Sequence, residues 1–153
     1  MVGPAAEQTA LVRHTSRIFV VGAGLTVPFF SIVLRKAYGL GAMAMSAGGM
    51  HESVFTAAWP TGEFGGMGLE GYVRLGFRKE MQAIADPAER AAWFEAKVAS
   101  LYEAGKALSI ASALEIDAVI DPEQTRRWIV AGLDAVPSPM PRAGRKRPCI
   151  DTW

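Results

Sequence analysis

The chain has 153 residues, half of them hydrophobic and a fifth charged, with a formal net charge of +1. This length suits one domain with a sizeable core, and the composition is that of an ordinary α/β protein. The near-zero charge provides no basic field, so no nucleic-acid partner is expected. The single cysteine, Cys149, excludes an internal disulfide framework and is typical of the reducing cytoplasm.

Neither a metal site nor a membrane span is expected. His14 and His51 lie far apart, without the neighbouring cysteines or carboxylates that a zinc site requires. The uncharged stretch 18–34 is at the short limit for a spanning helix, and two glycines and a proline interrupt it. The first residues also lack the basic segment and apolar run of a signal peptide.

The first sixty residues are predicted to form two helices and two strands in alternation. A helix is expected over 4–21, and a strand over 27–34 because its uncharged run suits burial on both faces. A second helix is expected over 42–48, followed by a strand over 54–59 that Pro60 ends. With one helix between them, the two strands should pair in parallel.

A glycine-rich loop is expected over 61–71, where glycine permits either close packing within the chain or close approach of a ligand or partner. A helix should follow over 71–84. Asp86 is a good N-cap for another helix, which should run to about Leu108. Gly105 within that helix marks either a weak point or a close contact with another helix.

The remaining sequence predicts a short strand over 116–120 and a last helix. Asp121, followed by Pro122 and Gln124, has the pattern of a capping box for this helix, which should extend to about Asp134. Its buried side chains are expected to be Trp128, Ile129 and Leu133.

A turn with two glycines, Tyr38–Ala42, is expected between the first strand and the second helix, and Arg35 and Lys36 close that strand. The first N–H groups of a helix have no partner within it, and the helix dipole makes this end electropositive. Gly39 and Gly41 would let a ligand approach the backbone. Such a turn could hold an oxyanion on peptide N–H groups, although a purely structural turn explains the same pattern.

Several motifs of the chain occur in the same order in one known family. They are LVRH (11–14), VPFFSIVLRKAYGLGA (27–42), AWPTGEFGGMGLEG (58–71), LGFRKE (75–80), EID (115–117), VIDP (119–122) and KRPCIDTW (146–153). In these motifs the chain resembles the carboxyltransferase (beta) subunit of biotin-dependent acyl-CoA carboxylases, of the acetyl-/propionyl-CoA carboxylase type. The resemblance is to the C-terminal, crotonase-like half of that subunit and covers nearly the whole chain.

The resemblance implies an α/β, crotonase-like (ClpP/crotonase) ββα superhelix, truncated at its N-terminus. Residues 1–136 would form the carboxyltransferase domain and residues 137–153 a proline-rich, basic tail. The implied reaction moves carboxylate from carboxybiotin to the α-carbon of an acyl-CoA, acetyl- or propionyl-CoA. It requires N–H groups aimed at developing negative charge and no side-chain nucleophile.

The resemblance also implies the site residues. The backbone amides of Leu40 and Gly41 would form the hole that stabilises the biotin oxyanion, and five further residues would bind the cofactor, namely Gly39, Ala42, Phe64, Gly65 and Gly66. An ungapped match places Met43 in the substrate pocket, where some propionyl-type members carry an acid.

The implied partners are an N-terminal carboxyltransferase half, a biotin carboxyl carrier, a biotin carboxylase and the acyl-CoA, within a cytoplasmic homo- or hetero-oligomer. Biotin would be carried on a separate domain, with no metal in this chain. The start at Met1-Val2-Gly3 resembles the end of a family motif, Gly-Phe-Met-Val-Gly, that a core strand precedes. A parallel sheet without that strand would expose an edge, and the chain alone is expected to be inactive.

Two alternatives remain at this point. A self-contained crotonase-type hydratase or isomerase would need an acid–base carboxylate near the glycine turn, and Glu52, Glu63 and Glu70 are the nearby candidates. A non-catalytic assembly subunit or gene fragment of such a carboxylase would keep the oligomer interface without the chemistry.

Overall fold

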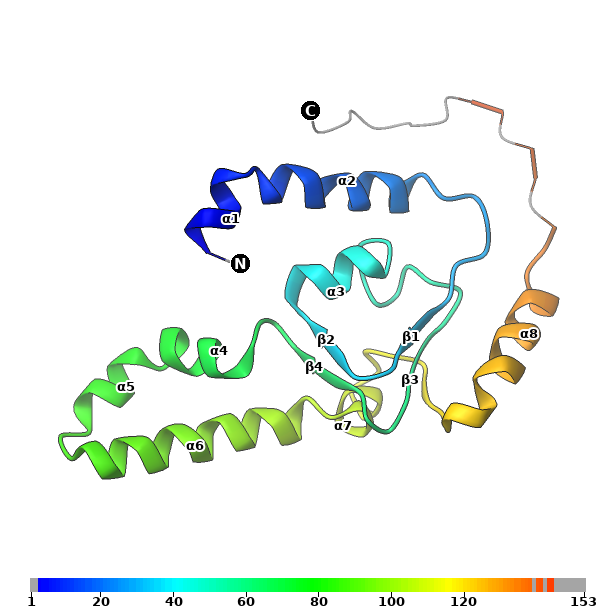
Figure 1. Ribbon diagram of the computed structural model, residues 1–153. Coiled ribbons are helices and arrows are strands. Elements are labelled where there is room, and N and C mark those ends of the chain that lie inside the picture. Colours follow the sequence, from blue (N-terminus) through cyan, green and yellow to red (C-terminus); the bar gives the residue numbers. More distant parts are fainter. Residues whose placement is uncertain (1–2, 139, 142, 145–153) are drawn as a thin grey trace.

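The computed structural model describes residues 3–138, 140–141 and 143–144. Short strands and helices follow one another (Figure 1): α1 (Pro4–Gln8), α2 (Leu11–Ala23), β1 (Ser31–Val33), β2 (Lys36–Tyr38), α3 (Gly39–Met45), β3 (Thr56–Ala58), β4 (Glu63–Gly65), α4 (Leu69–Gly76), α5 (Arg78–Ala83), α6 (Pro87–Ala104), α7 (Ala107–Ser112), β5 (Ala118–Val119), η1 (Pro122–Gln124) and α8 (Thr125–Ala135). The start motif at residues 1–2 and most of the predicted basic tail, including residues 145–153, lie outside the described residues.

Two small parallel sheets form the centre of the structure (Figure 1). In the first, β3 lies between β1 and β5, and Ile32 of β1 is in register with Ala57 of β3. In the second, β2 pairs with β4, and Ala37 is in register with Phe64. The parallel pairing predicted for the strands within 27–34 and 54–59 is confirmed.

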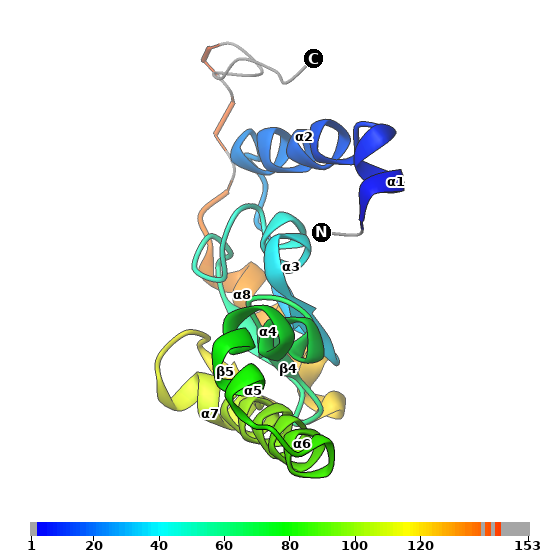
Figure 2. The ribbon, with the colours of Figure 1, turned by 90° about the vertical axis from the view of Figure 1, so that its left-hand side faces the viewer.

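Side chains cover both faces of the three-stranded sheet, as the uncharged first strand predicts. On one face, Phe55 and Ile120 pack with Trp128 and Ile129 of α8. The opposite cluster centres on five buried residues, Ala37, Ala58, Phe64, Ala107 and Ile116. Figure 2 shows the helices beyond this core, with α2 over α3 at one end of the molecule and α6 with α7 at the other.

The second sheet differs from the sequence prediction. Residues 35–36 were expected to end a strand and Tyr38–Ala42 to form a turn, but β2 occupies Lys36–Tyr38 and α3 begins directly after it. The chain bends between β1 and β2, where the Glu63 N–H donates to the Arg35 carbonyl at 2.6 Å. Strands of three residues that include a lysine or a glycine carry too little periodicity to be recognised, so β4 was likewise taken for loop.

Two predicted helices are broken, each at one residue with non-helical backbone. The helix expected over 4–21 is divided at Ala10, whose φ is 59°, beside a hydrogen bond of 2.8 Å from the Thr9 hydroxyl to the Ala6 carbonyl. The helix expected over 71–84 is divided at Phe77, whose ring lies 6.0 Å from that of Tyr72 and 6.1 Å from that of Trp93. Tertiary packing of this ring therefore outweighs helix continuity.

The two predicted caps differ in outcome. The Asp86 carboxylate accepts hydrogen bonds from the N–H groups of Ala88 and Glu89, which confirms the cap of α6. Asp121 makes no capping hydrogen bond, because a short 3₁₀ turn precedes α8. Leu133, expected in the core, is 50% exposed, because Trp128 and Ile129 form the face of α8 that meets the sheet.

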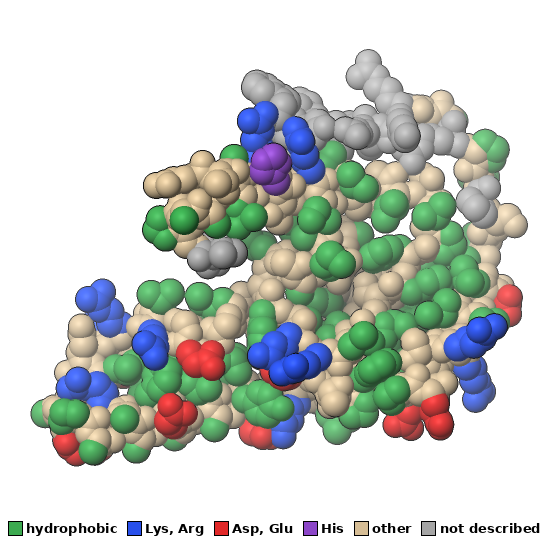
Figure 3. Space-filling model, viewed as in Figure 1, with side chains coloured by type: hydrophobic (Ala, Val, Ile, Leu, Met, Phe, Trp, Pro, Cys, Tyr) green, Lys and Arg blue, Asp and Glu red, His purple; other side chains and the backbone are tan. Residues whose placement is uncertain are grey.

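Large hydrophobic side chains remain exposed on several elements, including Val21 on α2, Leu34 after β1 and Leu40 on α3. Figure 3 shows hydrophobic side chains exposed across the face between α2 and α6. Surface of this kind is typical of an interface with other polypeptide. Among the residues that the structure describes, no helix combines the length and apolar character needed to cross a membrane.

Gly105 ends α6 where the chain meets the backbone of β4. The Phe64 N–H donates to the Gly105 carbonyl at 2.8 Å, and a Cβ at Gly105 would lie 2.2 Å from the Phe64 carbonyl oxygen. Glycine is therefore required at this position because the backbone of residue 105 approaches a strand closely. One of the two sequence-based interpretations had placed this close contact with another helix.

We predict that Gly105→Ala destabilises the fold by about 3 kcal/mol, since the added methyl group must displace backbone. Chemical denaturation monitored by circular dichroism measures this loss. Gly68→Ala is the matched control, because a Cβ at Gly68 would meet nothing within 4 Å. Equal stability of the two variants would contradict the close contact.

Candidate functional site

The amino-terminal end of α3 is exposed and directly follows β2. Tyr38 is the N-cap residue, and its side chain makes no capping hydrogen bond. The N–H groups of Gly39, Leu40 and Gly41 belong to the first turn and have no acceptor within the helix. Leu40 is 67% exposed, and a Cβ at Gly41 would meet nothing within 4 Å, so a ligand can approach these amides.

An open groove of about 820 Å³ reaches this end of α3. Its walls come from three parts of the chain, namely the run Phe29–Tyr38, the α3 residues Gly41, Ala42 and Met45, and the residues Ser46 and Met50 after α3. The two cations of the run, Arg35 and Lys36, are its only charged lining residues among those that the structure describes. The groove therefore offers positive charge and peptide N–H groups, which suits an anionic or polarised oxygen.

Two glycines of β4 and the following turn fix where α3 begins. Gly39 has a φ of +58°, and a Cβ there would lie 2.8 Å from the Gly66 carbonyl oxygen. A Cβ at Gly65 would lie 2.9 Å from ring carbons of Tyr38, with which Gly65 is in register. The segment Tyr38–Gly39 thus packs directly against Gly65–Gly66. A larger residue at position 39 or 65 would shift the first turn of α3.

A hydrogen bond across the second sheet holds the Tyr38 ring. Its hydroxyl donates to Glu63 Oε2 at 2.9 Å. Burial, followed by the hydrogen bond to Glu63 and the nearby negative charge, raises the pKa of Tyr38 to about 12. Tyr38 is therefore a permanent hydrogen-bond donor near neutral pH and not an acid–base group.

The residues predicted for the site are brought together in part. Gly39, Leu40, Gly41 and Ala42 form the first turn of α3, and Gly65 and Gly66 lie against it. Of the predicted residues, only Gly41 and Ala42 line the groove. Phe64 is buried in the core, and Met43 and Leu40 are exposed outside the lining.

Sequence reasoning missed three features of this site. Met45, one turn beyond Gly41, lines the groove in place of Met43. Which of the two methionines faces the groove depends on where the helix begins, and the structure places that start at Gly39. The Tyr38–Glu63 hydrogen bond was missed because β2 and β4 were not recognised as strands. Ser46 and Met50, which close the far end of the groove, give no recognisable signal in the sequence.

The carboxylates considered for a hydratase lie away from the groove. Glu63 and Glu70 border a second cavity of about 400 Å³, together with Glu95. Glu52 is exposed in the loop after α3. None of the three lines the groove beside the α3 amides within the described ranges, so acid–base chemistry on a carboxylate finds no support there.

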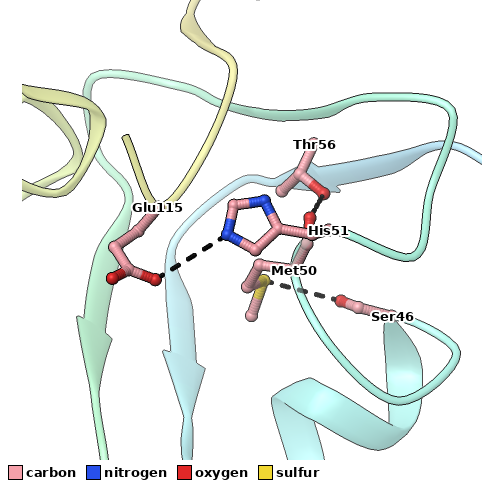
Figure 4. Close-up of polar contacts among 5 residues, drawn as sticks. All are labelled: Ser46, Met50, His51, Thr56 and Glu115. Carbon is pink, nitrogen blue, oxygen red and sulfur yellow. Dashed lines mark hydrogen bonds and ion pairs between the residues drawn. The ribbon is translucent and has the colours of Figure 1, made fainter. Parts of the chain in front are cut away.

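Polar contacts anchor the loop after α3 (Figure 4). The buried Thr56 hydroxyl donates to the Met50 carbonyl, and the Ser46 hydroxyl donates to Met50 Sδ at 3.7 Å. His51 Nε2 lies 4.0 Å from Glu115 Oε2, and both side chains are about two-thirds exposed. The His51–Glu115 contact is solvated and contributes little. The loop is held to the sheet by the Thr56 hydrogen bond and by the Ser53 hydroxyl, which lies 2.6 Å from that of Ser31 on β1.

Comparison with known proteins identifies the class of this fold. Residues 1–143 match the family described as the carboxyl transferase domain. The methylmalonyl-CoA carboxyltransferase 12S subunit of Propionibacterium freudenreichii subsp. shermanii is 37% identical over 131 residues, covering 84% of this chain and 24% of that protein. The propionyl-CoA carboxylase beta chain of Cereibacter sphaeroides is 32% identical over 127 residues, covering 83% of this chain and 24% of that protein.

Two solved structures agree. One, described as a single-chain, multi-domain long-chain acyl-CoA carboxylase, is 55% identical with a TM-score of 0.72, and the match covers 86% of this chain and 12% of that one. The other, a hexameric transcarboxylase 12S with methylmalonyl-CoA and methylmalonic acid bound, is 31% identical with a TM-score of 0.75, and the match covers 96% of this chain and 29% of that one.

The chain therefore belongs to the carboxyl transferase domain family, and its α/β fold is the crotonase-like fold of acyl-CoA carboxylase carboxyltransferases. It spans about a quarter of the length of the curated relatives named here.

We predict that Tyr38 titrates near pH 12 in an absorbance titration of the folded protein. Glu63→Gln should lower this midpoint but leave it above 10.0, because burial, the largest cause of the shift, remains. Since its pKa is raised in the folded state, the stability that protonated Tyr38 contributes is present below pH 10 and lost between about pH 10 and 12.

The matched control is Tyr72→Phe, which should leave the titration step near pH 12 in place, whereas Tyr38→Phe should remove it. Loss of that step in Tyr72→Phe would contradict the assignment.

Proposed function

We propose that this chain forms the biotin-facing part of an acyl-CoA carboxyltransferase, which transfers carboxylate between biotin and an acyl-CoA. The observation that carries this proposal is the exposed start of α3, whose first-turn amides have no acceptor within the helix and whose Gly41 and Ala42 line the groove, in a chain of the carboxyl transferase family. Biotin, when bound, supplies the ureido group that carries the carboxylate.

The residues of the chain have separate roles in this proposal. The N–H groups of Leu40 and Gly41 would donate to the biotin oxygen on which negative charge grows, and would stabilise it without a proton transfer. Gly41 fits this role because the space beside its Cα is open. Gly39 and Ala42 shape the turn, and Gly65 and Gly66 hold its position from β4.

The remaining parts of the carboxyltransferase complete the site. The chain spans a quarter of the length of its curated relatives and exposes many large hydrophobic side chains, which supports docking onto further carboxyltransferase polypeptide. This further polypeptide would include the N-terminal half of the carboxyltransferase, which would bind the acyl-CoA thioester. A biotin carboxyl carrier and a biotin carboxylase would act with the resulting cytoplasmic oligomer.

The relatives support two classes of acyl-CoA substrate for this function. Propionyl-CoA carboxylase is among the names of the relatives, which supports the short acyl chains, acetyl or propionyl, expected from the sequence motifs. The identity of 55% with a long-chain acyl-CoA carboxylase supports a longer acyl chain. The difference between these identities favours the long-chain substrate. Met43 and Met45 are the large α3 side chains that follow the proposed amides.

We predict carboxyl transfer only when the rest of the carboxyltransferase is supplied. The chain would be mixed with a Propionibacterium 12S subunit lacking its matched quarter, and transfer of ¹⁴C-carboxylate from methylmalonyl-CoA to biotin would be counted. The reverse reaction, from carboxybiotin, would then compare acetyl-, propionyl- and palmitoyl-CoA with the unshortened 12S subunit as the reference, and a shift toward palmitoyl-CoA relative to that reference would be due to this chain.

The chain alone and the shortened 12S subunit alone are the controls. Full activity of the isolated chain would contradict the proposal that carboxyl transfer requires the rest of the carboxyltransferase. A stable complex without transfer would overturn the catalytic proposal and favour an assembly subunit, and hydration of crotonyl-CoA would favour the hydratase alternative.

We predict that Gly41→Val lowers kcat of the reconstituted enzyme by about 100-fold, because the valine side chain would fill the open space beside Gly41 and keep the biotin oxygen away from the amide, an effect comparable to losing one donor of an oxyanion hole. The fold should tolerate the change, because nothing lies within 4 Å of the new Cβ. Gly71→Val on α4, whose Cβ would meet only the flexible end of Met67 at 3.5 Å, is the control. Unchanged turnover in Gly41→Val would exclude the amide pair.

A further inference from the structure

A diagonal contact across the second sheet joins β4 to the residue that precedes α3. Tyr38 is in register with Gly65 and its ring packs on that glycine, whereas its hydroxyl reaches Glu63, two residues earlier on β4. Diagonal neighbours on one face of a sheet lie far enough apart that long side chains are needed to join them. The ring is therefore held at two places, by packing against Gly65 and by the hydrogen bond to Glu63.

The acceptor of this hydrogen bond is itself held from both edges of β4. On the side of β2, the Glu63 N–H donates to the Arg35 carbonyl at 2.6 Å. On the other side, residue 63 forms an antiparallel bridge with Lys106, between α6 and α7, and two backbone hydrogen bonds of 2.8 and 3.0 Å flank that bridge. The backbone of Glu63 is thus fixed by two separate parts of the chain, which makes its carboxylate a stationary acceptor.

The Glu63 carboxylate is engaged by the Tyr38 hydroxyl and lies away from the groove. Its side chain is half-buried and borders the second cavity. Lys106, the residue bridged to it, pairs instead with Glu103 at 2.7 Å. Across the part of the chain that the structure describes, the hydrogen bond recorded for this carboxylate is the one from Tyr38. Glu63 therefore touches no ligand in the groove, and any effect on such a ligand must pass through Tyr38.

Tyr38 is connected to the α3 amides through very little backbone. It is the N-cap residue of α3, with an extended conformation (φ −115°, ψ 132°), and its side chain makes no capping hydrogen bond. Gly39 follows with a φ of +58°, and the N–H groups of Leu40 and Gly41 come next. Because these amides lie within three residues of Tyr38, a rotation of its backbone changes the direction in which they point.

We propose that Glu63 is a positioning residue for the amides at the start of α3. Through the Tyr38 hydroxyl it keeps these N–H groups in the orientation that meets the biotin oxygen, and no proton is transferred at Glu63. The strands β2 and β4 have three residues each, so few backbone bonds resist a shift of Tyr38. A displacement of about 1 Å at a reacting centre can cost about 100-fold in rate. The kinetic part of this inference rests on the proposed function.

Three variants of the reconstituted enzyme test the role of this hydrogen bond. Glu63→Leu removes the acceptor and should lower kcat about 10-fold, with KM for the acyl-CoA unchanged because Glu63 does not touch that substrate. Tyr38→Phe keeps the ring on Gly65 and removes only the hydroxyl, so it should lower kcat to the same extent. Glu63→Gln keeps an accepting oxygen and should retain kcat within about 2-fold. Combining Glu63→Leu with Tyr38→Phe should cost no more than either change alone.

The matched control is Glu70→Gln. Glu70 borders the same cavity and its negative charge also acts on Tyr38, but the hydrogen bond of the Tyr38 hydroxyl goes to Glu63. Removing the charge of Glu70 should therefore leave kcat unchanged. The pH dependence of kcat should keep its midpoints in Glu63→Gln and Glu63→Leu, whereas loss of an acid–base group would remove one of them.

A second measurement does not depend on turnover. In the ¹⁵N-labelled chain without partners, the N–H signals of Leu40 and Gly41 should shift in Glu63→Leu and in Tyr38→Phe. In Glu63→Gln and Glu70→Gln these signals should shift less, because the hydrogen bond to Tyr38 remains.

Unchanged Leu40 and Gly41 signals in a folded Tyr38→Phe variant would overturn the positioning role. A Glu63→Gln variant as slow as Glu63→Leu, or a Glu70→Gln variant as slow, would overturn it too, since charge rather than the hydrogen bond would then be responsible. Shifted signals with unchanged kcat, or no carboxyl transfer by the original reconstituted enzyme, would instead refute the proposed function and leave the positioning contact in place.

Discussion

The pairing of β2 with β4 is the constraint on which the candidate site depends. It places Tyr38 opposite Gly65, so that the ring occupies the space where another residue would have a Cβ. It also brings Gly39 onto the Gly66 carbonyl and so sets where α3 starts. The hydrogen bond from Tyr38 to Glu63 ties the same two strands through side chains, and the position of the first-turn amides follows from these contacts.

The chemistry proposed for these amides fits the groove around them. Peptide N–H groups have fixed direction and no pKa in the relevant range, so they stabilise a growing negative charge with little reorganisation. Arg35 and Lys36 add positive charge to the same groove, whereas the three carboxylates of the hydratase alternative lie outside its lining. β1, the edge strand of the first sheet, lines the same groove.

The sequence predicted the larger features of this fold and only part of the site. The uncharged runs around β1 and β3 reveal buried parallel strands, and Asp86 marks the start of α6. The second sheet was missed because pairing between segments some 25 residues apart leaves no local pattern in strands of three residues. The resemblance to the family pointed to Gly41 as a site residue. The close packing of the Tyr38 ring on Gly65 could be recognised only from the structure.

The attachment of α2 has a mechanical consequence. No residue of this helix is buried, and it approaches the body through Gly22, where a Cβ would lie 2.8 Å from the Cα of Ala47. Because none of its side chains is buried, α2 is expected to open at a lower free-energy cost than the sheet. The amino-terminal arm, α1 and α2, is therefore the part of the described chain in which we expect local unfolding to begin.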